Sequence, residues 1–179
     1  MNGLIVRVFV LAVLPVVTLL AGGMVMDRWS GRVNLGTTGD ARPLYLRWQG
    51  YDADAVKAHW EAIGAEAGLG AERSFLKIDL FFPFLYGGVL AACIGVAWHL
   101  LGRAAPLPWL LLPVLLGCIA DWVENSVQLG QLGHFLADPE TVNASWVRVA
   151  SVATQCKLGL LFAAYAVVAV LGVQIYRKG

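Results

Sequence analysis

The chain has 179 residues, of which 59% are hydrophobic and only 14% are charged, and its mean hydropathy is +0.69. This composition excludes an ordinary soluble domain and indicates an integral membrane protein. Thirteen basic residues balance twelve acidic ones. Because no run of Lys and Arg with interleaved aromatic residues is present, we expect no nucleic-acid partner.

Four apolar segments are each long enough to cross a hydrocarbon layer of about 30 Å. They cover residues 4–26, 78–101, 107–132 and 146–176. The first resembles a secretory signal in part, but its apolar run is longer than a usual signal core, so we expect an uncleaved helix. The prediction is an all-α fold in which residues 1–179 form a single membrane domain, a bundle of four transmembrane helices.

The connection between the first two spans, residues 27–77, is too long to be a simple turn. Residues 43–48 predict a short extended stretch or hairpin. Residues 52–67 predict an amphipathic helix, which either lies on the membrane surface or over the bundle, or forms a lid above a site in the membrane.

The predicted amphipathic helix has a start signal and a stop signal. Asp52 or Asp54 can cap its first turn, and Gly68 and Gly70 interrupt it. The apolar positions that recur at helical spacing are Val56, Trp60, Ile63 and Ala67.

Basic residues in the short connections predict the orientation of the spans. Arg103 lies between the second and third spans, and Arg177 and Lys178 follow the fourth. We therefore expect a multi-pass protein of the bacterial inner membrane with both termini in the cytoplasm, and with residues 27–77 outside. That long segment carries seven basic and seven acidic residues, but long translocated loops follow the positive-inside rule poorly.

The third span contains ionisable and amide side chains that an apolar segment does not need. In a helix they form one stripe, so they face a common polar partner rather than lipid. The stripe consists of Gly117, Asp121, Glu124, Asn125 and Gln128.

The fourth span supplies a cation at matching depth. Asp121 lies roughly 16 Å below the outer end of the third span, and Lys157 lies as far into the fourth. Because an isolated ion inside a membrane is costly, we expect Lys157 to pair with Asp121 or Glu124. Thr154 lies one turn from Lys157 on nearly the same face, together with alanines that allow close helix packing.

The second span adds polar groups near its outer end. Asp79, Pro83 and Tyr86 share one helical face, and Pro83 frees the backbone carbonyl of Asp79. Since the acidic and amide groups gather in the outer half, we expect a cavity that opens from the outer side.

Three short patterns carry a resemblance. The chain resembles an uncharacterised family of small bacterial four-helix integral membrane proteins in Asp79-x-x-Phe-Pro-x-x-Tyr-Gly, Asp121-x-x-Glu-Asn and Ser151-x-x-Thr-x-x-Lys. Gly50-Tyr51 before an amphipathic helix is similar as well. The resemblance covers most of the chain from Gly50 onward. It implies the same topology and the same polar positions, and it implies no particular activity.

The favoured function is a pocket that binds or processes a lipid or another amphiphile, and the sequence leaves open whether the protein is an enzyme. Asp121 and Glu124 are the candidate general acid or base, and Lys157 is their charge partner. The predicted ligand-binding residues are Asp79, Tyr86, Asn125, Gln128, Ser151 and Thr154. We expect no cofactor and no metal site, because the three cysteines and three histidines lie in separate regions without ligand spacing.

Two other functions remain open. In one, the charges form a purely structural network, and the protein is an accessory or assembly subunit of a membrane complex. In the other, the ionisable groups pass protons in a transport component. Membrane lipids are the expected partners, and a membrane-protein partner or a second copy of the chain is the alternative.

Overall fold

The computed structural model describes residues 2–31, 43–64, 66–103 and 108–178 of the chain. All regular secondary structure within these residues is helical, so the predicted fold class is confirmed. The elements in chain order are α1 (Asn2–Ser30), η3 (Leu44–Leu46), α2 (Ala53–Ala62), α3 (Glu66–Asp79), α4 (Phe82–Leu100), α5 (Pro108–Ala137), η4 (Pro139–Thr141) and α6 (Ala144–Lys178).

Four helical stretches are long and apolar enough to span a membrane, which makes this a multi-pass membrane protein. They are Phe9–Ser30, Ala67–Leu100, Pro108–Ala137 and Ala144–Lys178. The second stretch begins well before residue 78, where the sequence predicted it to begin. The reason is that α3 and α4 follow each other with only two residues between them.

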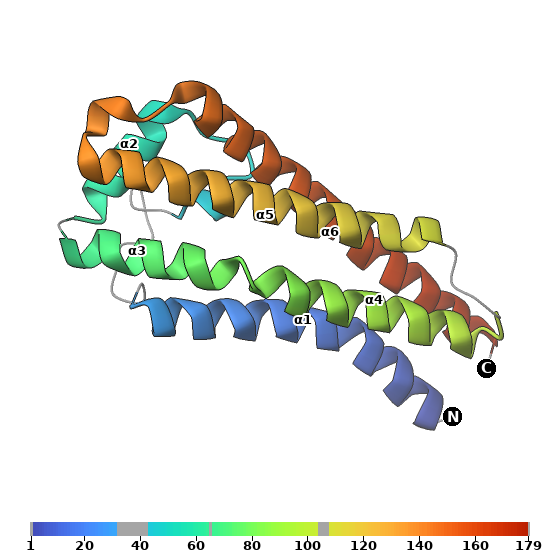
Figure 1. Cartoon of the computed structure of the whole chain (residues 1–179). Coiled ribbons are helices and arrows are strands. Elements are labelled where there is room, and N and C mark those ends of the chain that lie inside the picture. Colours follow the sequence, from blue (N-terminus) through green and yellow to red (C-terminus); the bar gives the residue numbers. More distant parts are fainter. Residues whose placement is uncertain (1, 32–42, 65, 104–107, 179) are drawn as a thin grey trace.

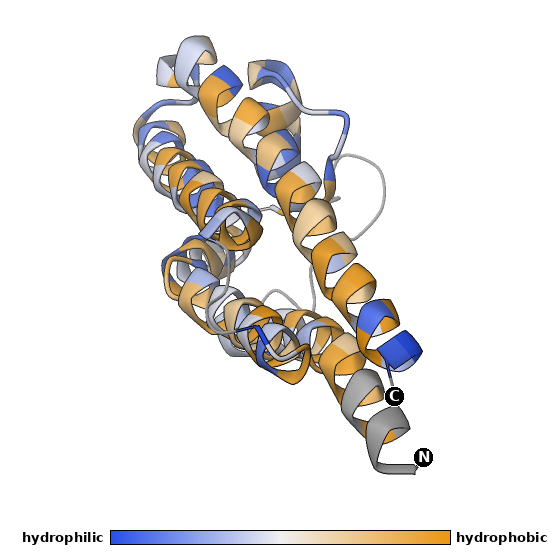
Figure 2. Cartoon of the chain, turned by 90° about the vertical axis from the view of Figure 1, so that its right-hand side faces the viewer, coloured by the Kyte–Doolittle hydropathy of each residue, from blue (hydrophilic) through white to orange (hydrophobic). Residues whose placement is uncertain are grey.

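The long helices run side by side, and their connections gather at two ends (Figure 1). One end, called here the α2 end, carries η3, α2 and the connection from α5 to α6. The other, called the terminal end, carries the beginning of α1, the end of α4 and the end of α6 (Figure 1). Hydrophobic residues dominate the long helices, whereas hydrophilic residues gather on α2 and at the helix ends (Figure 2).

The helix breaks between α3 and α4, close to Pro83, and α5 compensates the break. Asn125 Nδ2 donates to the carbonyl of Asp79 over 3.5 Å, and Trp122 Nε1 donates to the carbonyl of Leu80 over 2.9 Å. Carbonyl groups that a break leaves without helical donors are thus satisfied by side chains of the neighbouring helix. The prediction that Pro83 frees the Asp79 carbonyl agrees with this geometry.

The connection before α3 differs from its prediction in two places. Residues 44–46 form the 3-10 turn η3 rather than a hairpin. Asp52 caps α2 as predicted, since its side chain accepts from the Ala55 amide over 2.8 Å. However, α2 ends at Ala62 and is followed by Gly64 with a φ of +79°, a left-handed conformation that ends helices. The predicted stop at Gly68 and Gly70 is wrong, because both glycines lie inside α3.

Helix α2 packs against the bundle. His59 and Trp60 are almost completely buried, and the Trp60 ring lies 5.2 Å from the Phe135 ring of α5. Of the arrangements that the sequence left open, α2 therefore lies over the bundle.

Candidate functional site

Lys157 of α6 forms the centre of a buried charged cluster. Its Nζ lies 3.0 Å from Asp121 Oδ1 and 2.5 Å from Glu124 Oε2, both on α5. All three side chains are buried. The sequence placed Lys157 at the depth of Asp121 and left two partners open, and the structure shows that it contacts both. The contacts compensate charges that would be costly alone in an apolar interior.

Uncharged side chains donate further hydrogen bonds to the two carboxylates. Tyr86 Oη donates to Asp121 Oδ2 over 2.8 Å, and Asn125 Nδ2 donates to Asp121 Oδ1 over 3.0 Å. Gln128 Nε2 donates to Glu124 Oε1 over 3.1 Å. Each amide lies four residues after its acceptor on α5, the spacing that brings helical side chains together. All four carboxylate oxygens therefore have a polar partner.

Tyr51 connects this cluster to the α2 end. Its hydroxyl accepts from Gln128 Nε2 over 2.8 Å and lies 3.1 Å from Thr154 Oγ1. Thr154 donates its own hydroxyl proton to the Ala150 carbonyl, so Tyr51 is the donor to Thr154. Burial, followed by the Glu124 charge, raises the pKa of Tyr51 above its usual range. The phenol therefore stays protonated, as this pattern of bonds requires.

The backbone beside Tyr51 is held on α6. The Tyr51 amide donates to Ser151 Oγ over 2.8 Å. Gly50 has a φ of +88°, and a Cβ at this position would lie 2.8 Å from Ser151 Oγ. Only glycine accepts both this conformation and this close approach without strain. Gly50 and Tyr51, called here the strap, close the cluster on the side of the α2 end.

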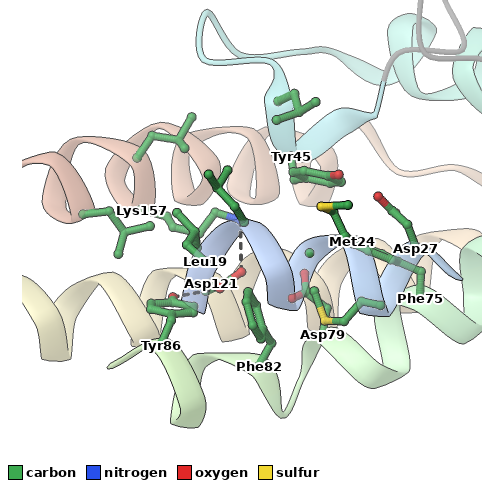
Figure 3. A pocket seen from close by; sticks show the side chains of 16 residues that line it. Leu19, Met24, Asp27, Tyr45, Phe75, Asp79, Phe82, Tyr86, Asp121 and Lys157 are labelled. Carbon is green, nitrogen blue, oxygen red and sulfur yellow. Dashed lines mark hydrogen bonds and ion pairs between the residues drawn. The ribbon is translucent and has the colours of Figure 1, made fainter. Parts of the chain in front are cut away.

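A cavity of about 330 Å³ lies beside the cluster, between α1 and α6 (Figure 3). This volume is typical of small-molecule sites, which occupy roughly 300–1,000 Å³. Polar side chains and apolar side chains form different parts of its wall. The polar ones include Asp27, Asp79, Tyr86, Asp121 and Lys157, and the apolar ones include Leu19, Leu20, Met24, Met26, Phe75, Phe82, Leu158 and Leu161.

The cavity reaches the apolar surface of the bundle. Leu20 and Met24 line it, yet they are 62% and 74% exposed. Farther toward the terminal end, Tyr165 Oη donates to the Pro15 carbonyl over 3.1 Å, which joins α6 to α1. The wall between α1 and α6 therefore has an apolar margin that is exposed at Leu20 and Met24.

The predicted site residues divide into two groups. Asp79, Tyr86, Asp121 and Lys157 line the cavity. The others lie behind this layer, where they support the carboxylates or the strap; they are Glu124, Asn125, Gln128, Ser151 and Thr154.

The sequence did not predict the contributions of α1 and η3. Leu19, Met24 and Asp27 of α1 and Tyr45 of η3 line the cavity together with the predicted residues (Figure 3). The apolar pattern of α1 gave no sign of which face meets a cavity. Tyr51 also belongs to the site, and its only signal was its place in the resemblance described above.

The side chains of the described residues offer no evident metal ligand set. In the parts of the chain that the structure describes, no group of three or more His, Cys, Asp and Glu side chains is placed to hold a metal ion. The chemistry of the cavity wall is thus that of carboxylates, one ammonium group and phenols.

Comparison with known proteins adds no relative. The sequence matches no family model, and no curated protein or solved structure matches it significantly.

Proposed function

We propose that this protein binds an amphiphile in the cavity between α1 and α6. The head group would contact Asp79, Asp121 and Lys157, and the alkyl chain would follow the leucine and methionine side chains toward the membrane. The observation that carries this proposal is the composition of one cavity wall, in which buried charged groups and an exposed apolar margin meet. Sites for small molecules combine apolar walls with a few convergent polar groups in this way.

The charges at the cavity favour a particular head group. The cluster holds three carboxyl groups, those of Asp79, Asp121 and Glu124, against the single ammonium group of Lys157, so it carries more negative than positive charge when all of them are ionised. An anionic head group would add to this excess in a low-dielectric site, whereas an ammonium group would reduce it. The ligand we propose therefore has an amine or hydroxyl head group that donates hydrogen bonds.

Any proton transfer to the bound head group would fall to Asp79 or Asp121. Both line the cavity, whereas Glu124 is completely buried behind Lys157. Asp121 is also held by Tyr86 and Lys157, and these contacts fix the orientation of its carboxylate.

The distribution of charge argues for binding rather than for proton transport across the bundle. Residues 80–120 and 141–179 contain no Asp or Glu. A proton route would have to continue from Asp121 toward the terminal end through segments that lack carboxylates. The cluster fits a site that is reached from one side better than a path between both sides.

A panel of single-chain ligands tests the proposal. The full-length protein in a nonionic detergent should bind dodecylamine more tightly than dodecanol, and dodecanoate about tenfold more weakly than the amine. Asp79→Asn should narrow the difference in affinity between the amine and the carboxylate, because it removes one carboxyl group from the wall. Asp54→Asn, an exposed change on α2, is the control and should leave all three dissociation constants unchanged. Equal binding of dodecanoate and dodecylamine, or no binding of any ligand, would contradict the proposal.

We also propose that the protein lies in the bacterial inner membrane with its terminal end in the cytoplasm. Arg103, Arg177 and Lys178 support this orientation, since all three belong to the terminal end, where positive charge marks the cytoplasmic side. Fusions after residue 178 give the test. Green fluorescent protein should fluoresce there and alkaline phosphatase should be inactive, and the opposite pair of results would reverse the orientation.

A further inference from the structure

A second cavity, of about 420 Å³, lies at the terminal end among α4, α5 and α6. Its walls are apolar, and they include Trp98, Leu110, Ala166, Val167, Val170 and Leu171. From Ala163 to Gln174, which both line it, α6 rises about 16 Å. This length is about half of a hydrocarbon layer of about 30 Å, so the groove matches the depth of one leaflet.

The end of this groove that lies near the ends of α4 and α6 carries basic side chains. The Arg103 guanidinium carbon lies 4.2 Å from the centre of the Trp98 ring, and its Nη2 donates to Gln174 Oε1 over 3.5 Å. Lys178 Nζ donates to the Leu101 carbonyl over 2.8 Å. Arg103 and Lys178 are both exposed. Both also lie beside the turn at the end of α4, since Arg103 follows that helix and Lys178 contacts the Leu101 carbonyl.

The sequence segments that form this groove contain no acidic side chain. Residues 80–120 and 141–179, which include all of its lining side chains, contain no Asp or Glu. A guanidinium group has five N–H donors, of which Gln174 uses one, so Arg103 has the capacity to bind a phosphate.

We infer that this groove holds an anionic phospholipid, with one acyl chain along α6 and the phosphate between Arg103 and Lys178. The apolar wall of the groove contacts the acyl chain. The basic rim, Arg103 and Lys178, gives the preference for a negatively charged head group. Basic pockets between transmembrane helices recognise acidic lipid head groups for these reasons. The site is separate from the cavity between α1 and α6, and it has the opposite charge preference.

Lipid retention measured by native mass spectrometry tests this inference. The full chain, exchanged into a nonionic detergent with equal amounts of phosphatidylglycerol and phosphatidylcholine, should retain phosphatidylglycerol preferentially. Arg103→Gln should lower the ratio of retained phosphatidylglycerol to phosphatidylcholine about fivefold, the effect expected for one charge. Arg148→Gln, at an exposed position of α6 near the α2 end, should leave the ratio unchanged.

Filling the groove provides a second arm that keeps the rim charges. Ala166→Phe should reduce the retention of both lipids, because Ala166 lines the groove. Ala169→Phe adds the same volume at an exposed position of α6 that is not part of the groove lining, and it should have no effect. Equal retention of the two lipids by the native chain would overturn the inference. The same conclusion would follow if Arg103→Gln behaved like Arg148→Gln, or Ala166→Phe like Ala169→Phe.

Discussion

Lys157 illustrates how single residues determine the interior of this protein. Its ammonium group is buried with two carboxylates within ion-pair distance, and each carboxylate has a further amide or phenol donor. Such a network tolerates burial because every member compensates another. Removal of one member should therefore cost more than its own contacts suggest.

A double-mutant cycle measures this dependence. Lys157→Met should reduce the free energy of unfolding by about 3–5 kcal/mol, because it leaves two buried carboxylates without their cation. Asp121→Asn should cost less, since Glu124 still pairs with Lys157. In the double variant the loss should fall short of the sum of the single losses by about 1 kcal/mol or more. Thermal unfolding in detergent micelles provides the measurement.

The exposed pair of Lys57 and Glu140, 3.3 Å apart, is a natural control for this cycle. Its coupling energy should stay below about 1 kcal/mol, because solvent screens surface ion pairs. Strict additivity for Lys157 and Asp121 would mean that their contact contributes nothing to stability.

The pairing of Lys157 could be predicted from the sequence because depth in two antiparallel helices can be counted. Equal distances from the same membrane boundary placed Lys157 and Asp121 at one level. The role of Tyr51 could not be predicted in this way. Its bonds to Ser151 and Thr154 join residues about 100 positions apart, through a connection whose path no periodicity describes.

Among the elements, the strap of Gly50 and Tyr51 depends most clearly on backbone conformation. Gly50→Ala should reduce the free energy of unfolding by about 1–3 kcal/mol, because a side chain is strained at its φ and also approaches Ser151. Gly64→Ala isolates the backbone effect, since Gly64 has a φ of +79° but no atom within 4 Å of an added Cβ. Chemical denaturation should give the larger loss for Gly50→Ala, and equal losses would show that the contact with Ser151 is unimportant.

The four spans followed from hydropathy, but the boundaries within residues 52–79 did not. The apolar positions of α2 and α3 continue at nearly the same spacing, so a single helix through Ala67 fitted the pattern. Gly64 ends α2 because its backbone is left-handed, whereas Gly68 and Gly70, which have the same residue type, lie inside α3. Choosing among three glycines requires the tertiary contacts of each segment.

The position of α1 against the other helices could also not be predicted from the sequence. Gly22 lies so close to α4 that an added Cβ would overlap the Phe82 ring. Phe82 in turn lines the cavity. This close approach sets one edge of the cavity, and a uniformly apolar helix contains no pattern from which it could be predicted.

At the scale of the whole molecule, charge is distributed unevenly along the bundle. All twelve acidic residues lie in segments 27–79, 121–124 and 138–140, whereas the terminal end has Arg103, Arg177 and Lys178. The two cavities follow this distribution, one with buried carboxylates and one with a basic rim. We therefore expect them to prefer amphiphiles of opposite head-group charge.

Binding of dodecylamine to a variant whose cavity is filled tests the central proposal most directly. Gly23 lines the cavity between α1 and α6, and a Cβ added there meets no atom within 4 Å, so the side chain of Gly23→Leu should occupy part of the cavity. Gly95→Leu introduces the same side chain at an equally open helical position outside the cavity lining. We predict that Gly23→Leu weakens dodecylamine binding at least about tenfold while Gly95→Leu does not. Equal dissociation constants for the two variants would contradict the assignment of this cavity as the binding site.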